Sequence, residues 1–141
     1  MQITLKVDPD EADIDAVRVG LRAYNREQIG RVPFYQNIVL HLRDEDGAIV
    51  GGLTATAVLD WLFIEFLHVN ESHRGHDHGS ALMAEAEVYA RANGLAGIWL
   101  DTFAFQARGF YEKLGFSVFG TIEDHPRGSA RYFLQKRFPT A

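Results

Sequence analysis

The fold of this chain is decided by the stretch Leu67-His68-Val69-Asn70-Glu71-Ser72-His73-Arg74-Gly75-His76-Asp77-His78-Gly79-Ser80. The stretch continues an apolar run, turns through a loop rich in Gly and His, and leads into a segment with Leu82, Met83, Ala86 and Tyr89 at helical spacing. This order predicts a strand, a loop and a helix. A helix that opens from such a loop presents unpaired backbone N–H groups and the positive end of its dipole. We therefore expect an anion site here, most naturally for a phosphate.

Composition limits the classes of protein to be considered. The 141 residues, 47% of them hydrophobic, suffice for one domain with a sizeable core, so we expect a single domain over residues 1–141. The net charge of -5 and the scattered Lys and Arg residues disfavour nucleic acid or a membrane surface as the main partner. The lack of cysteine excludes disulfides, thiolate metal sites and a Cys nucleophile. With no signal-like N-terminus and no long apolar run, we expect a cytoplasmic protein.

The first part of the chain predicts a strand, a helix and a loop. Residues 2–7 alternate polar and apolar side chains, which indicates a half-buried strand. An apolar stripe follows, with Asp10 or Asp13 as the candidate cap and Gly30 near the end of the helix. The aromatic residues of the loop at 31–36 either tuck under the sheet or line a substrate pocket.

Three strands are predicted next, and the third is the most apolar. Residues 37–43 and 48–58 form a hairpin around a turn at 44–47, in which Gly supplies the positive φ. Residues 61–69 are apolar on both faces, which is typical of a central strand covered on both sides. Unbroken alternation places Leu62, Ile64 and Phe66 on one face, and Trp61, Phe63, Glu65, Leu67 and Val69 on the other.

The remainder of the chain alternates helices and strands. Glycines that follow the apolar patterns at 94 and 115 mark the ends of two helices. The predicted elements are helices at 79–93 and 105–114 and strands at 98–100, 116–122 and 130–136. We therefore predict an α/β fold, with a mixed central sheet flanked by helices on both faces.

Two segments carry a family resemblance. Arg74-Gly75-His76-Asp77-His78-Gly79 resembles motif A of the GCN5-related N-acetyltransferase (GNAT) family, written Gln/Arg-x-x-Gly-x-Gly/Ala. Further along the chain, Phe110-Tyr111-Glu112-Lys113-Leu114-Gly115-Phe116 looks like the second hallmark of that family. Short glycine loops recur by chance, but the order and spacing of the two segments are specific. The resemblance implies a single-domain GNAT-like fold over residues 1–141.

The resemblance also implies an activity and a cosubstrate. Members of the family transfer the acetyl group of acetyl-CoA to a primary amine by direct attack on the thioester, without a metal. In the family, the pantetheine arm runs along the end of the strand that matches residues 66–69, where its amides can pair with the backbone. An Asn that is common after the next strand of the family is replaced here by Ala104, and Gln106 lies close by in the sequence. The implied CoA-binding residues are Leu67, His68, Val69, Arg74, Gly75, His76, Asp77, His78, Gly79, Ser80 and Gln106.

One position departs from the family pattern. The first glycine of motif A falls on Asp77, whose carboxylate stands close to the expected pyrophosphate. In one interpretation the Asp77 side chain points away and caps the helix while its N–H faces the phosphate. In the other, like charges weaken CoA binding unless Arg74 or a protonated His76 or His78 offsets them.

Tyr111 and Glu65 are the candidate catalytic residues. In the family, the tyrosine that matches Tyr111 donates a proton to the departing thiolate, although a purely packing role on its helix is the alternative. Glu65 is the only acid in the apolar strand, and burial there would raise its pKa toward the range of a general base. Glu65 could instead bind the substrate cation, with His68 or a water chain as the base. A backbone N–H from residues 67–69 would stabilise the oxyanion.

Two other classes of function compete with the acetyltransferase. The same fold could serve as a non-catalytic CoA-binding or sensor module. Less favoured is a metal-binding protein built on His68, His73, Asp77 and the neighbouring histidines. The expected partner is a small-molecule or peptide amine. Since family members often pair, a homodimer is possible.

Overall fold

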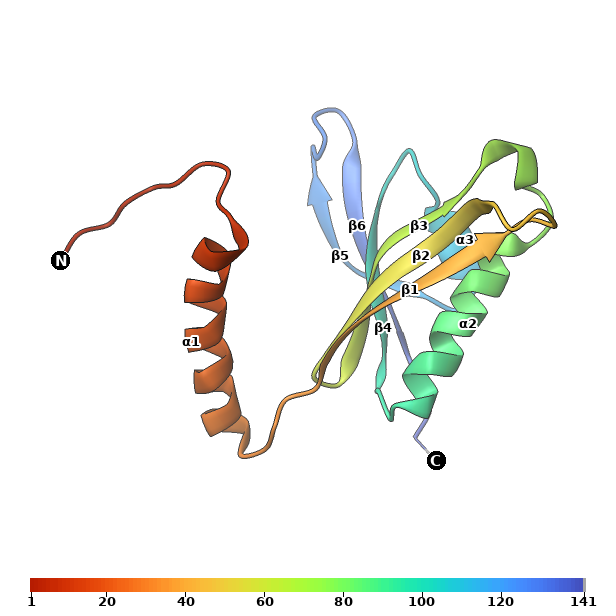
Figure 1. The fold of residues 1–141 in the computed structure, drawn as a ribbon. Coiled ribbons are helices and arrows are strands. Elements are labelled where there is room, and N and C mark those ends of the chain that lie inside the picture. Colours follow the sequence, from red (N-terminus) through yellow and green to blue (C-terminus); the bar gives the residue numbers. More distant parts are fainter. Residues whose placement is uncertain (141) are drawn as a thin grey trace. The chain divides into compact units, whose positions relative to one another are not determined.

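The computed structural model describes residues 1–140, and the contacts within the chain define two compact units (Figure 1). The first unit runs from Met1 to Pro33, and the second from Phe34 to the end of the chain. The expectation of a single domain stays a prediction.

The first unit contains one helix, α1 (Glu11–Ile29). Its start is a capping box, because the Asp13 N–H donates to the Asp10 carboxylate over 2.9 Å while the Asp10 N–H donates to the Asp13 carboxylate over 3.1 Å. Gly30, with φ 74°, ends the helix. The helix and its ends are therefore confirmed. The strand predicted at residues 2–7 is wrong: the segment is exposed and pairs with no described strand, and an extended segment without a partner is not stable.

The second unit is a six-stranded mixed sheet with two helices. Its elements are β1 (Tyr35–Arg43), β2 (Ile49–Val58), β3 (Trp61–Val69), α2 (His78–Ala92), β4 (Gly97–Phe103), α3 (Arg108–Lys113), β5 (Ser117–Glu123) and β6 (Ala130–Arg137), with a short 3₁₀ turn at Glu71–His73. The strand order is β1-β2-β3-β4-β6-β5, and only β3 and β4 are parallel. The predicted α/β class and the central position of β3 are confirmed.

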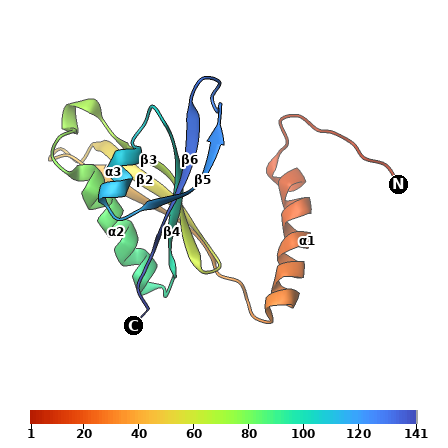
Figure 2. The same ribbon diagram turned by 180° about the vertical axis from the view of Figure 1, so that it is seen from behind.

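The core of this unit lies between α2 and the sheet. The apolar stripe of α2 buries Leu82, Met83, Ala86 and Ala90. These residues belong to one cluster with the buried side chains of β2, β3, β4 and β6, and with Tyr111 of α3. Figures 1 and 2 show α2 and α3 on the same side of the sheet. Each fully buried aliphatic side chain contributes about 1.5–3 kcal/mol to folding, so this cluster fixes the helices over that face.

The helix predicted at 105–114 is shorter than expected. Gln106 accepts the Phe103 N–H over 2.7 Å and the Thr102 hydroxyl over 3.2 Å. These bonds hold the residues after β4 in a turn, so α3 begins only at Arg108. Gly115, with φ 94°, follows the helix as predicted.

The two faces of β3 differ from the prediction because the strand contains a β-bulge. Phe66 lies opposite Thr54 and Ile64 lies opposite Ala55, which leaves Glu65 as the extra residue. The bulge interrupts the alternation, so Leu67 packs against the core like Ile64, while Phe66 is 64% exposed. The predicted grouping of Phe66 with Ile64 is wrong for this reason.

The parallel pairing between β3 and β4 also ends at the bulge. The last pair is Ile64 with Leu100, although β3 continues to Val69 and β4 to Phe103. Beyond that pair the two strands separate, and the backbone on this side of β3 loses its neighbour (Figure 1). The separation positions the candidate site, since it opens between the end of β3 and the start of α3.

Candidate functional site

The loop before α2 holds a row of free backbone amides. The N–H groups of residues 75–80 donate to no described residue, and the first helical bond of α2 joins the Ala81 N–H to the Asp77 carbonyl over 3.0 Å. All of residues 75–80 except His76 line a cavity of about 540 Å³. Its other walls are the end of β3, at Leu67–Val69, and the α3 segment with Ala107, Phe110, Lys113 and Leu114. The amides that the sequence places at this helix start are thus open and face a space that accommodates a ligand.

Local contacts fix the shape of this loop. Arg74 donates through Nε to the carbonyl of Val69 over 2.9 Å, which ties the loop to the end of β3. The His73 N–H bonds the Asn70 carbonyl over 2.9 Å in the short 3₁₀ turn. Gly75 then reverses the chain with φ 83°, a value that glycine adopts without strain.

Asp77 occupies the N-cap position of α2 but does not cap it with its side chain. Its backbone is left-handed, with φ 61° and ψ 21°, and the carboxylate accepts no hydrogen bond from the helix. The predicted side-chain cap is therefore wrong. The left-handed conformation gives a physical reason for a glycine at this position, since Asp tolerates it at a cost. The exposed carboxylate lines the cavity, so its negative charge faces the same space as the amides.

Gly79 allows the start of α2 to pack closely against α3. A Cβ on Gly79 would lie 3.3 Å from Cζ of the Phe110 ring, so a larger residue here would push that ring away by a few tenths of an ångström. This contact places the free amides of α2 and the side chains of α3 around one cavity.

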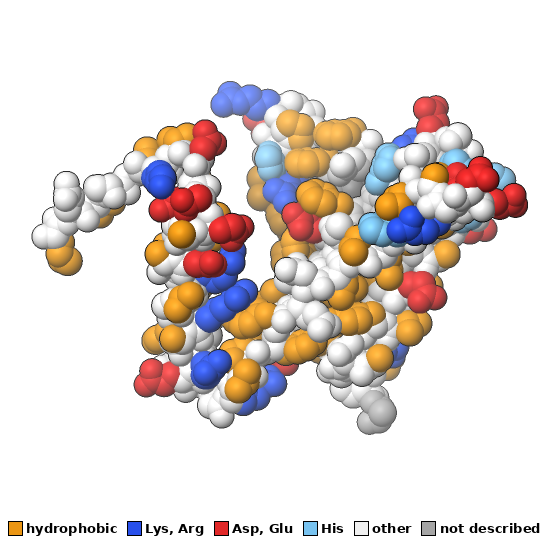
Figure 3. Space-filling view, in the orientation of Figure 1, with side chains coloured by type: hydrophobic (Ala, Val, Ile, Leu, Met, Phe, Trp, Pro, Cys, Tyr) orange, Lys and Arg blue, Asp and Glu red, His pale blue; other side chains and the backbone are white. Residues whose placement is uncertain are grey.

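The charges around the cavity include a cation that the sequence analysis did not single out. Lys113, exposed on α3, lines the cavity together with Arg74 and Asp77. The sequence feature that could have indicated Lys113 is its position inside the second hallmark segment, at residues 110–116. Figure 3 shows histidine and charged side chains gathered at the end of the second unit that holds this loop.

The histidines of the loop make local contacts. His73 Nδ1 lies 3.0 Å from the Ser72 hydroxyl, and His68 Nε2 lies 3.2 Å from the Asn70 amide oxygen. The rings of His76 and His78 are 6.0 Å apart. Residues 1–140 form no group of three or more His, Asp or Glu side chains arranged to hold a metal ion.

Tyr111 lies in the core with its phenol held in the protonated form. Its ring is 9% exposed and contacts Phe110 at 5.0 Å and Phe116 at 6.1 Å between centroids. Burial, and secondly the negative charge of Asp101, raise the pKa of Tyr111 above its ordinary value of 10.0. The Tyr111 hydroxyl makes no hydrogen bond with the described residues. Its oxygen is not one of the fully buried polar atoms that lack a partner among those residues. A neutral phenol at pH 7 retains the proton that a general acid must donate.

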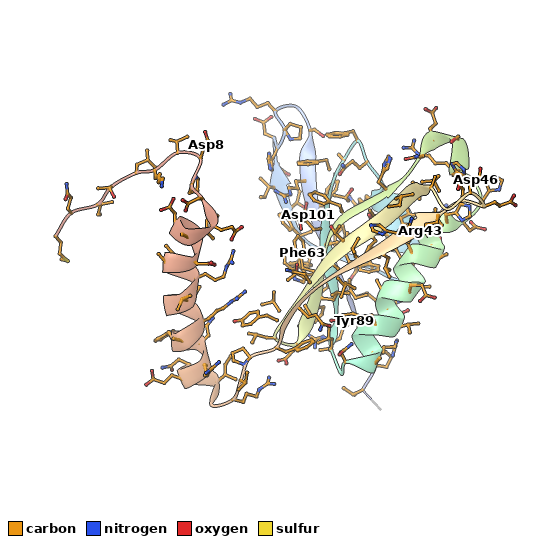
Figure 4. All side chains as sticks on the ribbon, in the orientation of Figure 1. Asp8, Arg43, Asp46, Phe63, Tyr89 and Asp101 are labelled. Atoms are coloured by element: carbon orange, nitrogen blue, oxygen red, sulfur yellow. The ribbon has the colours of Figure 1, made fainter. Side chains whose placement is uncertain are left out.

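Glu65 is exposed at the bulge, so the burial expected from the sequence is wrong. It forms no ion pair with the described residues. The next residue of β4 after the last pair is Asp101, whose carboxylate binds Arg131 over 2.8 Å. Glu65 and Asp101 therefore follow the last paired residues of the two strands, and Asp101 is labelled in Figure 4. Sequence reasoning missed the pairing of Asp101 with Arg131, because strand register brings these distant residues together.

Gln106 lies close to the cavity wall but is partly engaged. Its side-chain oxygen holds the turn after β4, through the Phe103 N–H and the Thr102 hydroxyl. Only the amide nitrogen remains for the CoA contact expected from the sequence.

Comparisons with known proteins agree with this geometry. A model of the Acetyltransferase (GNAT) family matches residues 8–116. An acetyltransferase of Agrobacterium fabrum is 33% identical over 132 residues, which are 92% of this chain and 96% of that protein. The blasticidin-S acetyltransferase of Streptomyces morookaense is 33% identical over 117 residues, 82% of this chain and 86% of that protein.

A solved structure gives the same result for the fold. The crystal structure of an acetyltransferase from Agrobacterium tumefaciens matches with a TM-score of 0.88 at 31% identity, covering 98% of this chain and 100% of that one. The helices of residues 1–140 all fall short of the length and apolarity that crossing a membrane requires. The family model and both sequence relatives name the same activity, and the chain therefore belongs to the GNAT family of N-acetyltransferases.

Proposed function

We propose that this protein transfers the acetyl group of acetyl-CoA to the primary amine of a small molecule or peptide. The observation that carries the proposal is the row of unoccupied amides at residues 75–80, facing a cavity of about 540 Å³. An N-terminal helix end with free N–H groups suits a pyrophosphate. Had the protein itself occupied these amides, the site would have no place for a nucleotide tail.

The remaining walls of the cavity suit the other parts of the cosubstrate. The pantetheine arm carries amides, and the backbone of residues 67–69 has lost its β4 neighbour, so the arm takes the place of a strand. Arg74 and Lys113 compensate the phosphate charge, and Asp77 opposes it. Of the remaining residues predicted to contact CoA, Gly75, His78, Gly79 and Ser80 line the cavity, whereas His76 and Gln106 are only adjacent in sequence to residues that line it.

The proposed chemistry uses the two candidate catalytic residues and the backbone at the end of β3. The acceptor ammonium gives up a proton to Glu65 or to water, and its nitrogen then attacks the thioester carbonyl carbon. A backbone N–H of residues 67–69 stabilises the oxyanion. When the C–S bond breaks, the phenol of Tyr111 donates its proton to the sulfur. The nitrogen of the intermediate loses its second proton to water, which leaves the neutral amide, and the phenolate regains a proton from solvent.

A small acceptor is favoured by one relative. The Streptomyces protein is named for acetylation of blasticidin S, and 86% of its length aligns with this chain. From this relative we infer only that the acceptor is a small amine. A cytoplasmic location and a homodimer stay predictions.

A combined binding and turnover experiment tests the proposal. Thermal unfolding is followed during titration with CoA, and CoA release from acetyl-CoA is measured across a panel of primary amines. We expect a higher Tm with CoA and turnover with at least one amine. A Tm shift without turnover for any amine would support the alternative of a CoA-binding or sensor module, for which the Asp77 charge is the one mild argument. If CoA does not raise the Tm and no amine is acetylated, the acetyltransferase and the CoA-binding module are both contradicted.

A further inference from the structure

One polar side chain in the core of the second unit has no part in the chemistry described above. Thr102 of β4 is 3% exposed, and it is the only polar or charged side chain in the buried core among residues 1–140. A hydroxyl inside a core costs free energy unless it is hydrogen-bonded, so its partners indicate what it does. Thr102 does not line the cavity beside the loop before α2, so any effect on a ligand passes through those partners.

The hydroxyl of Thr102 donates one hydrogen bond and accepts another. It donates to Oε1 of Gln106 over 3.2 Å, with the Phe103 carbonyl farther away at 3.5 Å, and its oxygen accepts the Ala107 N–H over 3.4 Å. Gln106 Oε1 also accepts the Phe103 N–H over 2.7 Å, which closes the turn between β4 and α3. Because only a hydroxyl combines one proton with free lone pairs here, an apolar side chain of the same shape cannot replace it.

The start of α3 depends on this hydroxyl. The N-cap residue of α3 is Ala107, whose side chain accepts no bond from the helix, and the helix is only six residues long. A helix of that length is not stable by itself in water, so contacts with the rest of the unit must hold it. The bond from the Ala107 N–H to Thr102 fixes the first residue of the helix to a buried point on β4.

Tyr111 is one helical turn away from this bond. The Tyr111 N–H donates to the Ala107 carbonyl over 3.3 Å, so Ala107 is bonded to Thr102 through its N–H and to Tyr111 through its carbonyl. The Tyr111 ring contacts the rings of Phe110 and Phe116, but no described residue forms a hydrogen bond that orients its hydroxyl. The place of the phenol therefore depends on where α3 begins. A displacement of about 1 Å of a reacting group can lower turnover about 100-fold.

We propose that Thr102 is a positioning residue of the acetyl transfer, whose buried hydroxyl sets the start of α3 and thereby the place of the Tyr111 phenol. The inference rests on the proposed function and adds to it a residue that touches neither acetyl-CoA nor the acceptor. Removing the hydroxyl should therefore lower turnover more than it lowers affinity for the cosubstrate.

Single variants test the role of the hydroxyl in the full chain. Thr102→Val keeps the shape of the side chain without the hydroxyl, and Thr102→Ser keeps the hydroxyl but removes a buried methyl group. We expect Thr102→Val to lower kcat about 10-fold with the KM for acetyl-CoA changed less than about threefold, and Thr102→Ser to keep kcat within about twofold of the wild type. Both variants should unfold at a lower Tm, so the kcat values separate positioning from a purely structural role. Thr56→Val is the matched control and should leave kcat unchanged, because the Thr56 hydroxyl of β2 donates to Asn37 of β1 over 2.8 Å.

A double variant tests whether the effect passes through Tyr111. Where the phenol is already absent its position has no effect, so adding Thr102→Val to Tyr111→Phe should lower kcat by less than a further factor of about two. A further loss of about 10-fold in that background would overturn the inference. Equal losses of kcat in Thr102→Val and Thr102→Ser would overturn it as well, and so would a kcat of Thr102→Val within about twofold of the wild type.

Amide hydrogen exchange measures the contact without turnover. The Ala107 N–H should exchange at least about 10-fold faster in Thr102→Val than in the wild type or Thr102→Ser, while the amides of α2 keep their rates. Equal protection of the Ala107 N–H in all three proteins would overturn the inference and leave acetyl transfer intact. A wild-type protein that acetylates no amine would instead overturn the acetyl transfer, and the positioning role with it.

Discussion

The two halves of β3 have opposite environments. Residues 61–64 pair with β2 on one side and β4 on the other, and Leu62 and Ile64 are fully enclosed. Residues 65–69 keep only β2, and Glu65 and Phe66 are exposed. The first half stabilises the sheet, and the second gives up a neighbouring strand and thereby opens a backbone edge. The comparison teaches that the candidate site begins where sheet pairing ends, at a single bulged residue.

The strongest test of this comparison is to delete Glu65. Without the extra residue Phe66 follows Ile64 directly, and regular alternation keeps Leu67 opposite Leu53, so Leu67 and Val69 stay on the core face. We therefore expect the variant to fold with a stability change of less than about 2 kcal/mol. What it loses is the local kink of the bulged strand, so β3 can pair with β4 beyond Leu100 and CoA binding should be lost. Thermal unfolding measures both effects: we expect a cooperative transition whose Tm does not rise on addition of CoA.

Glu65→Gln separates the bulge from its charge. Since it keeps the chain length, stability should change by less than about 0.5 kcal/mol. A deletion variant that binds CoA as tightly as Glu65→Gln would show that the separation of β3 and β4 does not depend on the bulge.

The second test removes the Tyr111 hydroxyl. If the phenol protonates the leaving thiolate, Tyr111→Phe should lower kcat by about 100-fold, with KM for acetyl-CoA little changed. Tyr89→Phe is the matched control, because Tyr89 is also helical but its hydroxyl bonds Gln36. A loss of less than about threefold in Tyr111→Phe would favour a packing role for this ring.

The raised pKa of Tyr111 predicts an effect on stability at alkaline pH. Its folded pKa lies above the ordinary value of 10.0 because burial, and then Asp101, disfavour the phenolate. The stabilising contribution is therefore complete below pH 10 and is lost as pH rises through the folded pKa. Denaturant unfolding between pH 9 and 11 should show stability falling less steeply in Tyr111→Phe than in the wild type. Parallel curves would contradict the shift.

The elements that could be predicted are those whose signals are local. The capping box of α1 and Gly30, like the free amides before α2, depend on residues within one turn of each other. The faces of β3 could not be predicted, since the bulge at Glu65 is set by the register with Thr54 and Ala55 of another strand. Residues 2–7 show the same limit: their alternation is correct for a strand, but no strand within residues 1–140 pairs with them.

The candidate site divides in the same way. The open loop that we propose as the anion site follows from glycine spacing and the helix start, which the sequence displays directly. The Asp101–Arg131 pair depends on which strands are neighbours, and β6 lies beside β4 although β5 precedes it in the chain. This pair therefore required the structure.

The comparison extends to the loop that follows β3 through Asp77. Asp77→Gly removes both a carboxylate from the cavity and a left-handed Asp, whereas Asp77→Asn removes only the charge. We expect both to lower the Kd for CoA about fivefold, since unit charges 4 Å apart in water repel by about 1 kcal/mol. Only Asp77→Gly should also raise stability, by about 0.5–1 kcal/mol. Calorimetric titration and thermal unfolding measure the two effects, and an unchanged Kd in both variants would exclude charge repulsion.

The smallest expected effect concerns Lys113, on the opposite wall of the cavity. An exposed cation near a pyrophosphate contributes about 0.5–1 kcal/mol, so Lys113→Met should raise the Kd for CoA by about threefold. Because salt screens such contacts, the difference between variant and wild type should narrow as ionic strength rises from 0.05 to 0.5 M, about a threefold drop in Debye length. Arg127→Met, at an exposed cation of the β5–β6 turn, is the control for net charge. An equal, salt-dependent loss in both variants would mean that CoA senses only the overall charge, and that the α3 wall of the cavity contributes no phosphate contact of its own.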